Sequence, residues 1–453
     1  MLKEKISAVL TSMGQPQLLT GIDLLSEQQL EQFFKQLQTF DAKLLSALKT
    51  SLFTEKKQRK SLLPIQYDEE RDLSEDAAVG KQLLEEGKAA CLILAGGMGS
   101  RLQASVPKAL IEITPIKKKT LLQLFLEKAM AASRRAQRFL PLAIMTSPLN
   151  HPIISRYLIQ NNWFGYPPSA VALFSQSMLP FLDDRGNWLL EEPGKIAAGP
   201  DGNGSALKGL FTAHIAQKWQ QDGVVYVSTV LIDNPLADPF DVEMLGLHQR
   251  CGSAAILKAV KRESVDEKVG LLALEKDRLT TVEYSEMEKE LKEAKNSGGG
   301  LLFPLANTGL FSLELNRLQT VVLDPLFALP WHWARKQAAV LLNTCEEKKE
   351  EVFIWKAETF FFDILNYVEN ARVLVCPRQK TFAPLKTMRG ENDLESVQKA
   401  LIEADKQRYF EVTGVNKISQ KQFELDPAFY YPTDQLIAKW RGCPLPKQEY
   451  IEA

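Results

Sequence analysis

The segment 90–102, with the sequence ACLILAGGMGSRL, constrains the fold of this chain more than any other stretch. Its short apolar run, residues 91–94, ends in three glycines within four residues. An apolar run closed by glycine is typical of a buried strand that enters a tight turn. Glycine lets another group approach the bare backbone, whose N–H groups can point at an anion. Because Arg101 and then Pro107-Lys108 follow closely, the turn suits a nucleotide triphosphate.

Two other glycine motifs do not fit this segment. The Walker A pattern requires Gly-Lys-Ser/Thr at the end of its loop, and that tripeptide is absent here. The dinucleotide fingerprint G-x-G-x-x-G begins at Gly97 and Gly99 but has Leu102 in place of its third glycine. We therefore disfavour a P-loop ATPase and an NAD-binding dehydrogenase.

From residue 89 to about 375, apolar runs alternate with amphipathic segments. We predict strands at 90–94, 142–145, 171–174, 224–228, 253–260 and 371–375. We predict helices at 121–134, 151–160, 204–219 and 360–368. Strands separated by helices indicate an α/β fold whose central sheet is mostly parallel and is covered by helices, with ligands at the carboxyl ends of the strands.

Two flanking regions differ from this pattern. Residues 1–88 are predicted to be helical, with apolar side chains on one face of 26–37 and Ser26 and Gln29 forming a capping box. They form either a helical cap on the main domain or a surface for a partner. Residues 376–453 are predicted to form a small C-terminal domain, so the chain is divided into 1–88, 89–375 and 376–453.

Composition limits the partners of the chain. It has 453 residues, 45% of them hydrophobic, and a formal net charge of −1, so no strong field favours nucleic acid or a membrane. No apolar run reaches the roughly 18 residues of a membrane span, and the first residues lack the apolar core of a signal peptide. The five cysteines are scattered without C-x-x-C spacing, which is typical of reduced thiols. We expect a cytoplasmic location and make no prediction of the oligomeric state.

Three polar clusters follow predicted strands or precede a helix. They read QSMLP at 176–180, GPDGNG at 199–204 and IDN at 232–234. Asn203, just before a predicted helix, can present its amide to a ligand. Asp233 follows a strand close to the glycine turn, where a carboxylate is either a Mg²⁺ ligand or the cap of the next turn.

These segments resemble, in the same order, the motifs of UTP-dependent sugar-1-phosphate uridylyltransferases, and of the UDP-N-acetylhexosamine pyrophosphorylase branch in particular. The glycine turn with Pro107-Lys108 resembles the family's nucleotide loop. The three clusters resemble its Q-G-M-L-P, P-D-G-N-G-G and V-D-N motifs. Further matches are VEYSE at 282–286, the segment 303–309 and FAPLK at 382–386. The resemblance spans roughly residues 60 to 420 and implies a Rossmann-like nucleotidyltransferase fold.

The resemblance also implies roles for individual residues. Catalytic groups on the phosphates would be Arg101, Lys108 and Lys386. The nucleotide would be bound by Leu94, Ala95, Gly96, Gly97, Gly99, Gln176 and Gly202. The sugar would be held by Asn203, Glu283 and Asn307, and Gly202 would contact it as well. Asp233 would help to bind Mg²⁺ or the sugar phosphate.

The implied reaction joins UTP and a sugar 1-phosphate into a UDP-sugar, with release of pyrophosphate. The VEYSE segment favours N-acetylglucosamine 1-phosphate as the sugar substrate. Gln103, Ser177 and residues 304–306 depart from the family motifs around the base and the sugar. Glucose 1-phosphate or galactose 1-phosphate therefore remains an alternative substrate. A further alternative is a relative that binds a nucleotide sugar without catalysis.

Overall fold

The structure is a computed structural model, and it describes all residues except 41, 55–61, 68–70, 100–105, 344–347 and 416–421. The chain forms two compact units. The smaller unit contains Met1–Lys60, Gln176–Ser205 and Ala328–Phe361, and the larger unit contains Ser61–Ser175, Ala206–Phe327 and Phe362–Ala453. The predicted division at residues 88 and 375 remains a prediction about folding domains.

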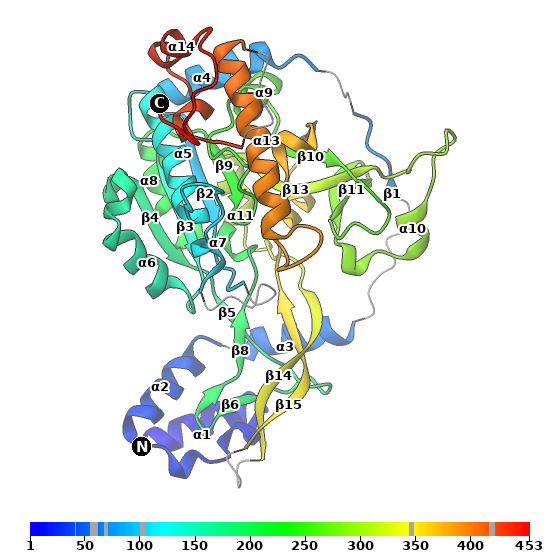
Figure 1. Cartoon of the computed structure of the whole chain (residues 1–453). Coiled ribbons are helices and arrows are strands. Elements are labelled where there is room, and N and C mark those ends of the chain that lie inside the picture. The colour runs from blue at the N-terminus through cyan, green and yellow to red at the C-terminus, as the bar shows by residue number, and fades with distance from the viewer. Residues whose placement is uncertain (41, 55–61, 68–70, 100–105, 344–347, 416–421) are drawn as a thin grey trace. The chain divides into compact units, whose positions relative to one another are not determined.

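The larger unit is built on a mixed sheet that has ten strands in the described part of the chain (Figure 1). Its main path runs β1-β11-β13-β9-β2-β3-β4, with β10 beside β13, β16 beside β10 and β12 beside β11. Strands β9, β2, β3 and β4 are parallel, whereas β13 runs antiparallel to β9. The predicted α/β class with a mostly parallel, mixed sheet is confirmed.

The strands of this sheet have the following bounds: β1 Leu62–Leu63, β2 Ala89–Leu94, β3 Leu142–Thr146, β4 Val171–Ser175, β9 Tyr226–Leu231, β10 Ala255–Lys261, β11 Leu271–Glu275, β12 Arg278–Val282, β13 Leu305–Glu314 and β16 Ala371–Val375. The helices of the larger unit include α4 Ser74–Glu85, α5 Leu121–Arg135, α6 His151–Gln160, α8 Ile215–Gln221, α9 Val242–Cys251, α10 Lys289–Glu293, α11 Leu315–Val322, α12 Arg378–Thr381, α13 Leu394–Thr413 and α14 Asp434–Trp440. Helix α7, Ser205–Thr212, begins at the boundary between the units. A small parallel pair, β17 Glu424–Leu425 and β18 Tyr450–Ile451, lies near the C-terminus.

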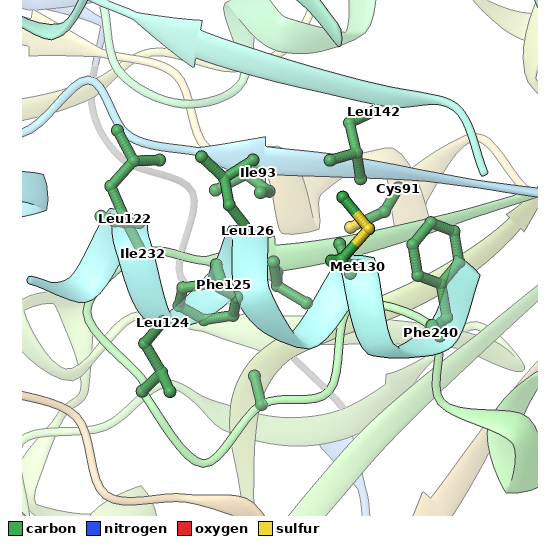
Figure 2. Close-up of a cluster of buried hydrophobic side chains, with 14 of the residues drawn as sticks. Cys91, Ile93, Leu122, Leu124, Phe125, Leu126, Met130, Leu142, Ile232 and Phe240 are labelled. Carbon is green, nitrogen blue, oxygen red and sulfur yellow. The ribbon is translucent and has the colours of Figure 1, made fainter. Parts of the chain in front are cut away.

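Strand β2 is buried along its whole length because both faces of the sheet are covered. Cys91 and Ile93 point toward helix α5 (Figure 2) and belong to one hydrophobic core with Phe125 of that helix. Leu92, whose side chain points to the opposite face by strand alternation, is also fully buried. A strand buried on two sides reads as a continuous apolar run, which is why the sequence located it.

Helices α4 and α9 cross at two glycines, Gly80 and Gly246. A Cβ added to Gly80 would lie 1.9 Å from the carbonyl oxygen of Val242, and one added to Gly246 would lie 1.7 Å from that of Asp76. Both obstacles are backbone atoms, so the helices would have to separate to admit a methyl group.

We expect Gly246→Ala to lower the free energy of unfolding by about 3 kcal/mol or more, at the upper end of overpacking costs. Denaturant unfolding would measure this change. The matched control is Gly298→Ala, where the nearest atom to the new Cβ is Asn296 Oδ1 at 3.4 Å. Equal stability of the two variants would contradict the close helix crossing.

His248 of α9 is fully buried and joins its helix to the sheet. Its Nδ1 lies 2.7 Å from Ser312 Oγ, and its Nε2 lies 3.0 Å from the carbonyl oxygen of Ser253. Burial lowers the pKa of this imidazole to about 4, so the folded protein keeps it neutral.

A pH dependence of stability follows from His248. The unfolded chain takes up a proton at this residue below about pH 6.5, whereas the folded protein does so only near pH 4. The free energy of unfolding should therefore fall by roughly 3 kcal/mol between these pH values on account of this one group. Denaturant unfolding of the wild type and His248→Gln at pH 7.5 and 4.5 measures it, and the same fall in both proteins would contradict the prediction.

The smaller unit combines N-terminal helices with short sheets. Its helices are α1 Leu2–Ser12, α2 Glu27–Gln38 and α3 Ala42–Phe53, and α2 has the predicted capping box. A four-stranded sheet, in the order β15-β14-β6-β7, consists of β6 Leu190–Glu192, β7 Lys195–Ile196, β14 His332–Asn343 and β15 Lys348–Glu358. Strands β5 Met178–Pro180 and β8 Ala198–Pro200 form a separate antiparallel pair. Residues of helices α1 and α2 share one hydrophobic core with Trp188.

The observed elements differ from the predicted ones in several places, and strands β11, β12 and β13 and helices α9 and α11 were not predicted. The predicted helix 204–219 is split into α7 and α8 because His214 adopts a left-handed conformation with φ of 56°. The predicted strand 224–228 begins later, at Tyr226. The predicted helix 360–368 is a short 3-10 helix, Phe361–Asn366. The hairpin of β14 and β15, drawn in yellow in Figure 1, was not predicted. No helix in the described part of the chain is long and apolar enough to span a bilayer.

Candidate functional site

The carboxyl ends of β2 and β9 lie side by side in the larger unit, because Leu94 pairs with Leu231 in parallel register. Strand β2 leads into the glycine turn, and β9 leads into the turn that contains Asp233. Crevices at the carboxyl ends of parallel strands are the usual ligand sites of such sheets. The topology therefore places two of the predicted site segments next to each other.

The glycine turn is held by backbone and side-chain hydrogen bonds. Gly99 has a φ of +71°, which favours glycine, and the backbone N–H of Lys108 donates to Gly97 O at 3.2 Å. The buried Asn150, at the start of α6, donates from Nδ2 to Ala95 O at 3.0 Å. The sequence reasoning missed Asn150, although its place after a predicted strand was a usable signal.

Lys108, Asp233 and Lys386 meet in a cluster that we call the phosphate cluster. Lys386 Nζ lies 2.7 Å from Asp233 Oδ2, and Lys108 Nζ lies 3.3 Å from the same oxygen. Lys108 Nζ also donates to Leu385 O at 3.1 Å. Lys108 and Lys386, which are 125 and 153 positions away from Asp233 in the sequence, thus meet at one of its carboxylate oxygens.

The charge of Asp233 is fixed by its two partners. Burial raises the pKa of its carboxyl, but the ammonium groups of Lys386 and Lys108 outweigh burial and lower the pKa to about 2. Asp233 is therefore ionised at neutral pH. Its second oxygen, Oδ1, is buried and has no hydrogen-bond partner among the described residues.

A divalent cation fits this oxygen. Mg²⁺ is commonly bound through one or two carboxylates together with substrate phosphates, rather than by an all-protein cage. The described residues contain no group of three or more His, Cys, Asp or Glu side chains that could hold a metal ion by themselves. Asp233 Oδ1 is thus a donor suited to a metal that arrives with a phosphorylated substrate.

Asn234 places Lys386 opposite Asp233. Its Nδ2 donates to Thr381 O at 2.8 Å, and its Oδ1 accepts from Ala383 N at 3.1 Å. The backbone N–H of Leu385 also donates to Asp233 O at 2.8 Å. These bonds hold the segment 381–386 against the turn that follows β9. The backbone of Lys386 is therefore fixed close to Asp233.

Glu283 and Asn307, predicted to hold the sugar, lie around Gly270 in the larger unit. A Cβ on Gly270 would be 3.5 Å from Glu283 Oε2 and 3.7 Å from Asn307 Cβ. The backbone N–H of Asn307 donates to Gly270 O at 2.8 Å. The structure therefore gathers these two side chains around Gly270, where an added Cβ would also lie 2.8 Å from Thr281 Cγ2.

Gln176, Gly202 and Asn203 belong to the smaller unit. Gly202 has a φ of +93°, and a Cβ there would lie 2.2 Å from the carbonyl oxygen of Thr359. Asn203 Oδ1 accepts from Phe361 N at 2.8 Å. Gln176 is buried and lies between β4 and β5.

The structure thus brings some of the predicted site residues of the larger unit together. Lys108, Asp233 and Lys386 are in contact, and Glu283 lies beside Asn307 across Gly270. Leu94 ends β2, and Ala95 to Gly97 and Gly99 lie in the glycine turn. Arg101 lies outside the described residues. The roles of all these residues remain predictions.

Comparison with known proteins identifies the relatives of the chain. The model of the family described as UTP–glucose-1-phosphate uridylyltransferase matches residues 31–429. A probable UDP-N-acetylglucosamine pyrophosphorylase of Dictyostelium discoideum is 28% identical over 363 residues, which cover 74% of this chain and 74% of that protein. The UDP-N-acetylglucosamine pyrophosphorylase of Saccharomyces cerevisiae is 28% identical over 407 residues, which cover 84% and 85%.

Solved structures share the fold. The uridine diphosphate N-acetylglucosamine pyrophosphorylase of Trypanosoma brucei, crystallised with an inhibitor, superposes with a TM-score of 0.79 at 22% identity, covering 100% of this chain and 98% of that one. A putative UDP-N-acetylglucosamine pyrophosphorylase of Entamoeba histolytica gives a TM-score of 0.73 at 23% identity, covering 87% and 99%. At these identities the likeness establishes the fold.

Proposed function

The chain belongs to the UTP–glucose-1-phosphate uridylyltransferase family, and from this premise we propose that it makes UDP-N-acetylglucosamine and pyrophosphate from UTP and N-acetylglucosamine 1-phosphate. The choice of sugar rests on the names of the relatives from Dictyostelium and Saccharomyces, both UDP-N-acetylglucosamine pyrophosphorylases. The VEYSE segment at 282–286, which carries Glu283, supports the same choice.

The observation that carries the proposal is the phosphate cluster beside the glycine turn. Two lysines from distant parts of the chain meet one ionised carboxylate at the ends of β2 and β9. Unit charges about 4 Å apart interact by roughly 4 kcal/mol at an effective dielectric constant of about 20. Two ammonium groups can therefore offset much of the repulsion between UTP and a sugar phosphate.

In the proposed reaction an oxygen of the sugar phosphate attacks the α-phosphorus of UTP in line, and pyrophosphate leaves. The attacking oxygen is already ionised at neutral pH, so no strong general base is needed. Lys108 and Lys386 would bind phosphate oxygens and stabilise the charge that develops on the leaving group. Arg101 would add a third positive charge from the glycine turn.

To bind the phosphates, Lys108 and Lys386 would have to contact phosphate oxygens as well as Asp233. Asp233 would keep them oriented, while its Oδ1 would serve as the protein ligand of Mg²⁺. The metal would supply neutralisation of phosphate charge. Glu283 and Asn307 would hold the sugar, with Gly202 and Asn203 beside it, and Gln176 would contact the uracil.

A pyrophosphate-release assay with UTP and Mg²⁺ tests the proposal. We expect release with N-acetylglucosamine 1-phosphate at a kcat/KM above that for glucose 1-phosphate. Higher kcat/KM with glucose 1-phosphate would identify the alternative substrate. UTP binding without release with any sugar phosphate would instead identify a non-catalytic relative.

A further inference from the structure

Lys128 is a fully buried lysine on the apolar face of α5. Its ammonium group donates to Pro235 O at 3.0 Å and to Ala237 O at 3.0 Å, and it lies 3.4 Å from Asp238 Oδ1. The ring of Tyr430 lies 4.3 Å from the same nitrogen. Every N–H of Lys128 thus points to an acceptor, and all three acceptors belong to one segment, 235–238.

The other oxygen of Asp238 binds a second cation. Arg408 Nη2 lies 3.2 Å from Asp238 Oδ2. Arg408 belongs to α13, the helix that begins at Leu394, eight residues after Lys386. Asp238 therefore connects α5, through Lys128, with the helix that follows the Lys386 segment.

The segment 235–238 is the direct continuation of the turn that holds Asp233. Ala237 N donates to Asn234 O at 3.0 Å, and Asn234 N donates to Leu231 O at 3.1 Å. Movement of this segment would therefore shift Asp233 and, through Asn234, the segment 381–386. The described contacts of Lys128 include none of Lys108, Asp233 and Lys386, so its effect on the phosphate cluster passes through these bonds and through the Asp238–Arg408 pair.

We propose that Lys128, together with Asp238 and Arg408, forms a positioning group that holds Asp233 against Lys108 and Lys386. This inference rests on the proposed function. Lys128 touches no substrate in this scheme and is a positioning residue. Its action is to fix the carbonyl groups of Pro235 and Ala237, and thereby the direction of the Asp233 carboxylate.

The cost of burial supports a specific role. A buried ammonium group is expensive unless all its donors are satisfied, and burial indeed lowers the pKa of Lys128 against the opposing effect of Asp238. An apolar residue could fill the same space, but it would leave two buried carbonyl groups without partners. Lys128 is therefore suited to fixing the backbone conformation of the segment 235–238, because it binds the carbonyl groups that an apolar side chain would leave without partners.

Titration calorimetry with UTP and Mg²⁺ tests the proposal, because it reports affinity and the fraction of competent protein separately. We expect Lys128→Met to raise the Kd for UTP about 10-fold, as when a coupled positioning contact is lost, with a stoichiometry near one. Arg408→Gln, at a partly exposed side chain, should raise it about 3-fold and serves if Lys128→Met does not fold. Ser133→Ala removes a buried hydroxyl of the same helix, bonded to Leu140 N, and should leave Kd unchanged.

A second measurement asks whether the effect passes through Asp233. In the Asp233→Asn background, Lys128→Met should change Kd by less than about 2-fold, because coupled residues are not additive. Equal effects in both backgrounds, or lower stoichiometry at an unchanged Kd, would show a merely structural role and overturn the proposal. Absence of UTP binding by the wild type would overturn the proposed function and this inference with it.

Discussion

Lys386→Ala is expected to lower kcat for pyrophosphate release by a factor on the order of 10²–10³, the usual effect of removing a preorganised donor to developing charge. The ammonium group that lies 2.7 Å from Asp233 would be lost from the phosphate cluster. Lys108→Ala should have an effect of the same size, and Arg101→Ala is expected to act similarly. Steady-state turnover with saturating UTP and sugar phosphate measures each factor.

Lys399→Ala is the matched control for Lys386→Ala. Lys399 lies in the following helix, is largely exposed and pairs with Glu395, so its loss should leave kcat within about 2-fold, because exposed ion pairs contribute little. Wild-type turnover in both Lys108→Ala and Lys386→Ala would show that these lysines do not act in catalysis, although the protein itself would still catalyse the reaction.

Asp233→Asn is expected to lower kcat by a factor of at least about 10², again on the scale of a lost electrostatic group at the reaction centre. The substitution keeps the shape of the side chain but removes the charge that lies between two ammonium groups. It also weakens the oxygen suited to Mg²⁺. We therefore expect the Mg²⁺ concentration for half-maximal rate to rise as well, which a titration of rate against Mg²⁺ would measure.

Asp324→Asn serves as the control for this carboxylate. Asp324 caps an exposed turn by accepting from Leu326 N at 2.8 Å, far in sequence from the cluster, and its variant should keep the wild-type Mg²⁺ dependence. If Asp233→Asn lowered kcat with no change in that dependence, Asp233 would orient the lysines without binding the metal.

The fold was predictable where one local signal dominated. Strand β16 and helix α6 have the predicted bounds, because an apolar run and a clear helical period each have one reading. The split between α7 and α8 depends on the left-handed backbone conformation of His214. The residue type does not predict this conformation. The hairpin of β14 and β15 was missed because its polar, half-exposed strands acquire their pairing from each other.

The site was predictable to the extent that its residues follow strand ends. Asp233 was predicted in this way, and Asn150, which also follows a strand, could have been predicted by the same rule. Lys386 was found by resemblance, because no local pattern shows that a residue 153 positions away reaches Asp233. Lys128 carried a signal that went unused, namely a lysine within an otherwise apolar helical stretch.

A crystal structure of the chain with UTP and Mg²⁺ would test the role of the phosphate cluster most directly. The ammonium groups of Lys108 and Lys386 are expected within hydrogen-bond distance of phosphate oxygens, about 2.7–3.2 Å, with Asp233 on the metal. A bound nucleotide whose phosphates lay away from both lysines, with the lysines still on Asp233, would contradict the assignment of this cluster to phosphate binding.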